Sequence, residues 1–289
     1  MKNAIFRGCA TALITPFSGG KVDLLALGRL IDWQIDEGID ALVIGGTTGE
    51  AATLSDSERY KIFEFSKARV AERVPLIFGT GTNDTRVAVE HTKEAERIGC
   101  DGVLVVTPYY NKGTDEGIYR HYMTIAEATG LPIILYNVPG RTGVSLSIKI
   151  LKRLSECERI VGIKEAQDSV ERLASLACIR EDLPLYAGND AATLPTIALG
   201  GLGVISVVSN IYPGKMAELC KRAFTGDIVG AREIQTELLP LINSLFLETN
   251  PAPLKYAMSL LSLAKDELRL PLFEVTESTK KAIFDNICK

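Results

Sequence analysis

Short apolar runs rich in valine, isoleucine and leucine recur along the chain, and each is followed by a stretch with helical periodicity. The runs are continuous rather than alternating, which is typical of parallel strands buried on both faces beneath helices. We therefore predict eight strands, at Ala10–Thr15, Ala41–Gly45, Leu76–Thr80, Gly102–Thr107, Ile133–Val138, Ile160–Glu165, Leu185–Gly188 and Gly203–Val208.

Helical patterns fill the intervals between these strands. The first of them, Leu24–Gly38, places Leu27, Leu30 and Ile31 on one face. A capping-box sequence, Ser55 to Glu58, opens the second. The remaining helices are predicted at Asn83–Gly99, Asp115–Gly130, Ser145–Cys157, Ser169–Ile179, Ala191–Leu199 and Pro213–Gly226.

Eight β-then-α units within residues 1–226 match the size of a (β/α)8 TIM barrel. A doubly wound open sheet is the alternative, but it usually carries a glycine-rich fingerprint after its first strand, and Thr15–Gly20 does not match one. Residues 227–289 have helical patterns and no strong strand. We predict an α/β fold with a catalytic barrel domain at 1–226 and a C-terminal helical subdomain at 227–289.

Charge and hydropathy exclude several classes of partner. The formal net charge is -4 and basic residues are scattered, so we expect no nucleic-acid partner. No apolar run approaches the length of a membrane helix. The residues before Ala10 contain a single apolar pair, Ile5-Phe6, and therefore do not make a signal peptide. We expect a cytoplasmic protein.

Cysteine and histidine usage argues against a metal centre. None of the cysteines forms a Cys-x-x-Cys pair, and we interpret them as reduced, mostly buried thiols. Two histidines, His91 and His121, lie far apart in helical patterns, so neither a zinc site nor a histidine-based triad is expected. The cysteines are Cys9, Cys100, Cys157, Cys178, Cys220 and Cys288.

Lys164 is the strongest candidate for chemistry. In a TIM barrel, function lies at the C-terminal ends of the strands, and Lys164 follows the apolar run Ile160–Ile163 at such an end. Burial favours the neutral form of an amine, which is the form that attacks a carbonyl to make an imine. The alternative is a lysine at the strand tip that points to water or pairs with Glu165.

Three other polar residues at strand ends have both functional and structural interpretations. Tyr136 is a proton shuttle beside Lys164, or a core tyrosine with a satisfied hydroxyl. Thr47 passes a proton onward, or caps the next helix. Arg141 binds a substrate carboxylate, or forms a surface ion pair. The Asn137–Gly140 stretch is a rigid turn that would orient Arg141.

Two alternatives come from other classes of protein. Glu50 and Glu165 at strand ends suit acid–base work on a glycoside. Against this, glycosidase clefts are often lined with tryptophan, and the single tryptophan here, Trp33, is in a helical pattern. A barrel that senses a 2-oxo acid without turnover is the other alternative.

Five motifs occur in an order that resembles a known family. Together they are similar to the 4-hydroxy-tetrahydrodipicolinate synthases, within the N-acetylneuraminate lyase superfamily of Schiff-base barrel aldolases, and the resemblance covers nearly the whole chain. The sister sialic acid lyases and 2-keto-3-deoxy sugar acid aldolases are the alternative within that superfamily. The motifs are Gly8–Phe17, Gly46–Glu50, Thr107–Asn111, Tyr136–Gly143 and Gly162–Ala166.

The resemblance implies a reaction and its catalytic residues. Lys164 would form the imine with pyruvate, and Tyr136, Thr47 and Tyr110 would relay protons, with Tyr110 reaching into a neighbouring subunit. Arg141 would hold the carboxylate of L-aspartate 4-semialdehyde. The resemblance also implies lysine and diaminopimelate biosynthesis, a homotetramer built as a dimer of dimers, and no cofactor or metal.

The resemblance further implies how pyruvate is bound and whether lysine regulates the enzyme. Thr48 and the backbone around Gly188 and Ile205 would line the pyruvate pocket. Lysine-inhibited members tend to carry histidines where this chain has Asp56 and Arg59. They tend to carry glutamate where it has Val87, whereas Asn83 and Tyr109 are retained. We therefore expect weak or absent feedback by lysine.

Overall fold

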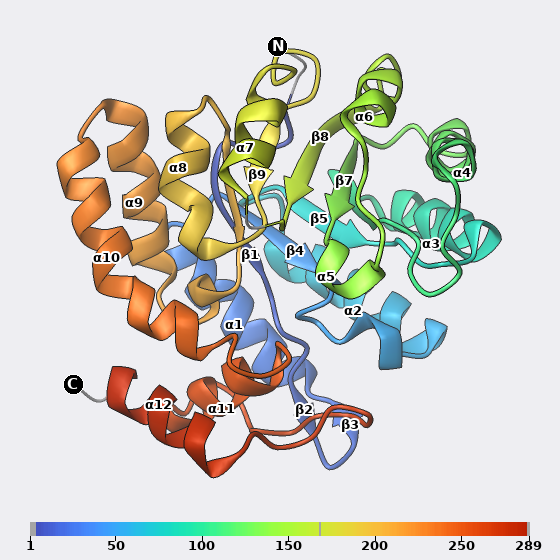
Figure 1. The fold of residues 1–289 in the computed structure, drawn as a ribbon. Coiled ribbons are helices and arrows are strands. Elements are labelled where there is room, and N and C mark those ends of the chain that lie inside the picture. Colours follow the sequence, from blue (N-terminus) through green and yellow to red (C-terminus); the bar gives the residue numbers. More distant parts are fainter. Residues whose placement is uncertain (1–3, 168, 288–289) are drawn as a thin grey trace.

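The computed structural model describes residues 4–167 and 169–287, and within them eight parallel strands close into a barrel (Figure 1). The first barrel strand, Gly8–Ala12, hydrogen-bonds to both the next barrel strand along the chain, Ala41–Ile44, and the last one, Gly203–Ser206. This closure confirms the TIM barrel and excludes an open sheet. Around the barrel the strands are β1 (Gly8–Ala12), β10 (Gly203–Ser206), β9 (Leu185–Ala187), β8 (Ile160–Glu165), β7 (Ile133–Asn137), β6 (Gly102–Val106), β5 (Leu76–Gly79) and β4 (Ala41–Ile44).

Side chains of the strands alternate between two packed layers. One layer fills the barrel interior and includes Ala10, Ile134 and Ile205, among others. Neighbouring strand positions, such as Leu135 and Ile163, belong to the larger core between the strands and the surrounding helices. Because both faces are buried, the strands are apolar along most of their length, which explains the continuous runs in the sequence.

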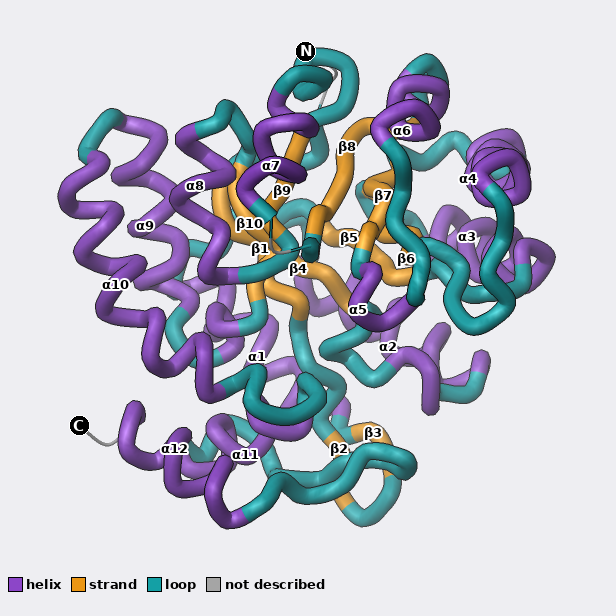
Figure 2. Tube along the Cα trace, in the orientation of Figure 1, coloured by secondary structure: helices purple, strands orange, loops and turns teal. Residues whose placement is uncertain are grey.

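Helices form the outer ring (Figure 2). Ser55 and Glu58 make the predicted capping box at the start of the second helix, with the Ser55 N–H donating to Glu58 Oε2 at 3.0 Å. The helices of the ring are α1 (Leu24–Asp36), α2 (Asp56–Val70), α3 (Thr85–Ile98), α4 (Asp115–Glu127), α6 (Ile148–Ser155), α7 (Val170–Ala177), α8 (Thr193–Ala198) and α9 (Pro213–Thr225). The short α5 (Pro139–Thr142) follows β7 directly.

The first strand differs from its prediction. It begins two residues earlier and ends at Ala12, because the Ile14 N–H donates to the side-chain oxygen of Asn210 at 3.1 Å instead of joining the ladder. A hairpin that the apolar pattern did not predict follows, with strands β2 (Phe17–Ser18) and β3 (Lys21–Val22). Gly19 and Gly20 join them with φ of 60° and 77°, values that favour glycine in a tight turn.

Three further helices follow the barrel: α10 (Ile228–Ser244), α11 (Ala252–Leu260) and α12 (Glu277–Ile287). Helix α10 packs on α9, and α12 packs on both α10 and α11. The segment between α11 and α12 lies beside the β2–β3 hairpin (Figure 1). The tail of the sequence therefore returns to the same end of the barrel as the residues that follow β1.

The described residues contain neither a membrane-spanning helix nor a disulfide. No helix within residues 4–167 and 169–287 has the length and apolar character needed to cross a membrane. Five of the cysteines lie in this part of the chain and none of them forms a disulfide, while Cys288 lies outside the described residues.

Candidate active site

The pairing of β7 and β8 brings Tyr136 and Lys164 side by side. Ile133 pairs with Ile160, but the next residue, Ile134, pairs with Gly162, so Val161 is an extra residue in β8. Beyond this irregularity Tyr136 is opposite Lys164. A shift of one residue turns the following side chains to the other face of a strand, so this bulge sets which side of β8 carries the lysine.

Lys164 is buried, with 4% of its surface exposed. Its Nζ lies 4.4 Å from the centroid of the Tyr136 ring. The side chain therefore does not project into water, which removes one structural alternative for this residue. Asp190, also buried, is close enough to interact electrostatically with Lys164, and burial raises the pKa of the Asp190 carboxyl.

Glu165 lies on the opposite face of β8 from Lys164. Its Oε1 accepts from Asn137 Nδ2 at 2.7 Å and its Oε2 accepts from Arg172 Nε at 2.9 Å. Burial raises the pKa of the Glu165 carboxyl, and the Arg172 guanidinium opposes that effect. Because this carboxylate is held by Arg172 and Asn137, it is not the ion-pair partner of Lys164.

Glu50 is also held in a buried ion pair. It adopts a left-handed conformation with φ of 53°, and its carboxylate contacts Lys255 Nζ, with both side chains fully buried. The Arg269 N–H donates to its second oxygen at 3.2 Å. The glycosidase alternative required Glu50 and Glu165 as acid and base. Each is instead paired with a cation, Glu50 with the fully buried Lys255 and Glu165 with the partly buried Arg172.

A cavity of about 440 Å³ opens at this end of the barrel. That volume suits a small-molecule site. Thr47, Tyr136 and Arg141 all line it, so the structure brings these three predicted residues together. Lys164 is reached through Tyr136, which it contacts, and is not itself among the lining residues.

Thr48 and Arg141 are joined through a residue of the C-terminal segment. Asn250 Nδ2 donates to Thr48 Oγ1 at 2.9 Å, and Arg141 Nη2 donates to the backbone oxygen of Asn250 at 2.8 Å. Thr48 and Asn250 are buried, whereas Arg141 is exposed. The structural alternative for Arg141 was a surface ion pair, and the contact observed is with a backbone carbonyl instead.

Gly188 and Ile205 lie on neighbouring parts of the barrel. The Gly188 N–H donates to the backbone carbonyl oxygen of Glu165 at 2.6 Å, and a Cβ at position 188 would be 2.8 Å from that oxygen. Glycine therefore allows this backbone to approach the end of β8. Ile205 packs in the interior layer that also contains Tyr136. Neither residue lines the large cavity.

Tyr110 is not brought to this cavity. Its side chain is 90% exposed, and its φ of 69° is in the left-handed region. The neighbouring Tyr109 does line the cavity. Within a single chain, the predicted relay therefore comprises Tyr136 and Thr47, and Tyr110 stands apart.

The cavity includes the two positions on which the expectation of weak lysine feedback rests. Asp56 and Arg59 line it together with His91. Asp56 Oδ1 is 2.9 Å from His91 Nε2, and Arg59 Nη2 donates to the Ala51 oxygen at 2.8 Å. Burial lowers the pKa of His91, and Asp56 opposes that shift.

The sequence did not indicate that the C-terminal segment supplies part of the cavity wall. Asn250, Pro251, Pro271 and Leu272 all line it. They lie between helices, where the sequence shows neither a strand end nor a recognised motif. The cluster Asn250-Pro251, which interrupts two helical patterns, was the available signal, and by itself it indicates only a turn.

Comparison with known proteins gives one consistent result. The Dihydrodipicolinate synthetase family matches residues 5–289. A 4-hydroxy-tetrahydrodipicolinate synthase of Thermotoga neapolitana is 48% identical over 280 residues, 95% of each chain.

Solved structures agree with this. The dihydrodipicolinate synthase of Thermotoga maritima has a TM-score of 0.96 at 42% identity, covering 99% of this chain and 98% of that one. The dihydrodipicolinate synthase of Acinetobacter baumannii, described as chloride-inhibited and solved with pyruvate, has a TM-score of 0.96 at 41% identity, covering 99% and 98%. With a match to the family over nearly all its length and relatives well above 30% identity, this chain belongs to the dihydrodipicolinate synthetase family.

Proposed function

We propose that this chain is a 4-hydroxy-tetrahydrodipicolinate synthase. It is a lyase of the class I aldolase type that condenses pyruvate with L-aspartate 4-semialdehyde in lysine and diaminopimelate biosynthesis. The observation that carries the proposal is a buried lysine, Lys164, packed against the Tyr136 ring beside a cavity of small-molecule size. Membership of the family supplies the identity of the substrates.

The reaction begins at the Lys164 amine. Its nitrogen attacks the keto carbon of pyruvate and water leaves, giving an imine. Loss of a methyl proton converts the protonated imine into an enamine, whose carbon forms a bond to the aldehyde carbon of the second substrate. The amino group of that substrate then attacks the imine carbon, closes the ring and releases Lys164. The protonated imine is the electron sink for loss of the methyl proton. In the bond-forming step the enamine donates its electrons to the aldehyde carbon, and the aldehyde oxygen takes up a proton.

Proton transfer requires hydroxyl groups near the imine. Tyr136 is the nearest candidate because its ring contacts Lys164, and Thr47 lines the same cavity. We assign the third hydroxyl to Tyr110 of a second copy of the chain. An exposed tyrosine held in left-handed backbone, a conformation that costs roughly 1–3 kcal/mol, is expected where the ring serves a partner. We propose that the assembly is a homotetramer, a dimer of dimers.

Substrate carboxylates require donors on opposite sides of the new bond. We assign the carboxylate of the aldehyde substrate to Arg141. Its guanidinium is exposed at the cavity, and one of its nitrogens, Nη2, donates to the backbone oxygen of Asn250. We assign the pyruvate carboxylate to Thr48 and to the backbone around Gly188 and Ile205. The Asn250 amide donates to a lone pair of the Thr48 hydroxyl oxygen, which leaves the Thr48 O–H available to donate to the substrate.

The division of the chain and its location follow from this assignment. We propose that residues 1–226 form the catalytic barrel domain and residues 227–289 a C-terminal helical subdomain that completes the cavity wall. We also propose that the reaction takes place in the cytoplasm, where amino-acid biosynthesis supplies both substrates.

The identity of the second substrate is tested by competition between aldehydes. Purified enzyme is given pyruvate with L-aspartate 4-semialdehyde or pyruvate with N-acetylmannosamine, and product formation is followed by mass spectrometry. We expect turnover with the amino-acid aldehyde and at least 100-fold less with the sugar. Preferential turnover of N-acetylmannosamine or of a sugar-derived aldehyde would identify the chain as a sister aldolase instead.

A further inference from the structure

Asn250 contacts both of the residues assigned to substrate carboxylates. Its side-chain amide donates to Thr48 Oγ1 at 2.9 Å, and its backbone oxygen accepts from Arg141 Nη2 at 2.8 Å. It lies 202 positions from Thr48 and 109 from Arg141 in the sequence. One residue of the C-terminal segment therefore links two groups on different βα loops of the barrel.

The direction of the hydrogen bond to Thr48 determines what that hydroxyl can do. A threonine hydroxyl has one donor and two acceptor positions. Because the Asn250 amide donates, it occupies an acceptor position and leaves the Thr48 proton free to be donated elsewhere. A side chain that accepted instead would draw the proton toward position 250. The amide thus favours the orientation in which Thr48 donates to a ligand.

The position of Asn250 is costly for stability. The side chain is 4% exposed, and its Oδ1 has no hydrogen-bond partner among the described residues. A buried acceptor without a partner destabilises a folded protein. An apolar side chain of similar size would avoid that cost and would keep the backbone contact with Arg141, so the asparagine is explained by what its side-chain amide does at Thr48.

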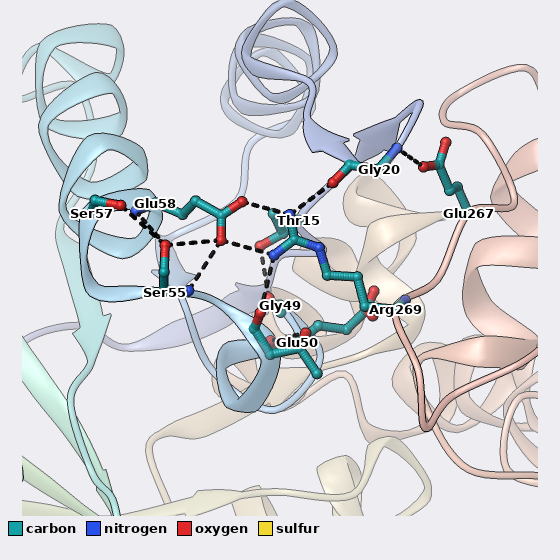
Figure 3. Close-up of polar contacts among 10 residues, drawn as sticks. Thr15, Gly20, Gly49, Glu50, Ser55, Ser57, Glu58, Glu267 and Arg269 are labelled. Atoms are coloured by element: carbon teal, nitrogen blue, oxygen red, sulfur yellow. Dashed lines mark hydrogen bonds and ion pairs between the residues drawn. The ribbon is translucent and has the colours of Figure 1, made fainter.

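The segment that carries Asn250 is fixed to the barrel on one side. Five residues later, Lys255 forms an ion pair with Glu50, which ends the loop that contains Thr47 and Thr48. Lys255 Nζ also donates to the backbone oxygen of Glu267 at 2.9 Å. Arg269 contacts both Glu58 and the Gly20 oxygen (Figure 3). These contacts hold the turn before α11 against the loop, so the Asn250 amide has a defined direction.

We propose that Asn250 is a positioning residue for pyruvate binding. Its amide sets the direction of the Thr48 hydroxyl toward the pyruvate carboxylate, and its backbone oxygen fixes one nitrogen of Arg141. The inference rests on the proposed function, because it assigns the ligand of Thr48 from that reaction. It adds a residue of the C-terminal segment to the set that determines affinity for the first substrate.

The test compares Asn250→Ala, Asn250→Asp and Thr48→Val with the double variant Asn250→Ala/Thr48→Val. Steady-state KM and kcat for both substrates and the melting temperature are measured on the full-length enzyme. We expect Asn250→Ala to raise the pyruvate KM about tenfold, as loss of one hydrogen bond does, with kcat within about threefold and no fall in melting temperature. In the Thr48→Val background the same change alters the pyruvate KM less than about twofold.

Asn250→Asp reverses the polarity of the contact in nearly the same volume. Its carboxylate accepts the Thr48 proton and repels a substrate carboxylate, so we expect the pyruvate KM to rise on the order of 100-fold. A wild-type KM in Asn250→Asp would show that Thr48 donates to position 250 and would overturn the proposal. So would additive effects in the double variant, or a lower melting temperature with an unchanged KM.

Failure of the proposed function has a different signature. In that case the wild-type enzyme itself does not turn over pyruvate with L-aspartate 4-semialdehyde. If Asn250→Ala does not fold, Asn250→Ser provides the same comparison with a small side chain that remains polar. Its pyruvate KM is then expected to lie between those of the wild type and Asn250→Asp.

Discussion

Replacing Lys255 with methionine tests how the C-terminal segment is held to the loop that contains Thr47 and Thr48. The Lys255 and Glu50 side chains form an ion pair in which both are 0% exposed. Lys255 Nζ also lies 4.1 Å from the centroid of the Phe17 ring. Methionine keeps most of the apolar contact and removes the charge, which leaves the Glu50 carboxylate buried with one backbone donor, the Arg269 N–H.

The magnitude follows from breaking a buried pair. Removing one partner leaves an uncompensated buried charge and costs about 3–5 kcal/mol of unfolding free energy. For a chain of this size each kcal/mol lowers the melting temperature by about 2–3 °C, so Lys255→Met is expected to lower it by about 6–15 °C. Removing both charges, in Glu50→Gln/Lys255→Met, is expected to restore more than half of that loss.

The assay is thermal unfolding followed by circular dichroism at one protein concentration, because assembly makes the midpoint depend on concentration. Lys215→Met is the matched control, since Lys215 pairs with Glu237 on the surface, with side chains 44% and 60% exposed. That pair contributes less than about 1 kcal/mol. If Lys255→Met lowered the melting temperature no more than Lys215→Met, the buried pair would not be what holds the C-terminal segment to the loop that contains Thr47 and Thr48.

Three further outcomes are expected. Tyr136→Phe lowers kcat about 10²- to 10⁴-fold through loss of proton transfer, with imine formation retained; an unchanged kcat contradicts the relay. Arg269 hydrogen-bonds Glu58 and lowers its pKa from 4.5 to about 2, so the stability from this contact is present above pH 4.5 and is lost as the pH falls toward 2. Glu58→Gln is expected to lower the unfolding free energy by about 1 kcal/mol at pH 6, a value reduced for the partial exposure of the pair. Urea denaturation at several pH values should show a weaker pH dependence of the unfolding free energy in Glu58→Gln than in the wild type, and an equal dependence in both proteins would refute the prediction. Millimolar lysine leaves the initial rate within about 20%, and strong inhibition contradicts the expectation drawn from Asp56 and Arg59.

The barrel was predictable because its strands are buried on both faces. That environment requires a nearly unbroken apolar sequence, and runs such as Ile133–Val138 and Gly102–Thr107 fulfil it. The end of β1 was not predictable, because the Ile14 N–H donates to a side chain 196 positions away, that of Asn210, which follows the last strand of the barrel. The β2–β3 hairpin is too short to produce a pattern of alternating residues.

The site was predictable only in part. Tyr136 and Lys164 stand at strand ends, and the general rule for barrels selects such positions. Their alignment depends on the extra residue at Val161, which no periodicity reveals. Glu50 looked equally suited to chemistry, and only the three-dimensional contact with Lys255 distinguishes a structural carboxylate from a catalytic one.

Trapping the imine shows directly whether the Lys164 amine is the nucleophile that captures pyruvate. Enzyme incubated with pyruvate is reduced with borohydride, digested and analysed by mass spectrometry, with Lys164→Ala and a sample without pyruvate as controls. The covalent route through Lys164 predicts a stable three-carbon adduct on the Lys164 peptide, irreversible loss of activity, and neither effect in the controls. An unmodified Lys164 in inactivated enzyme, an adduct on another lysine, or full activity in a Lys164→Arg variant would contradict it.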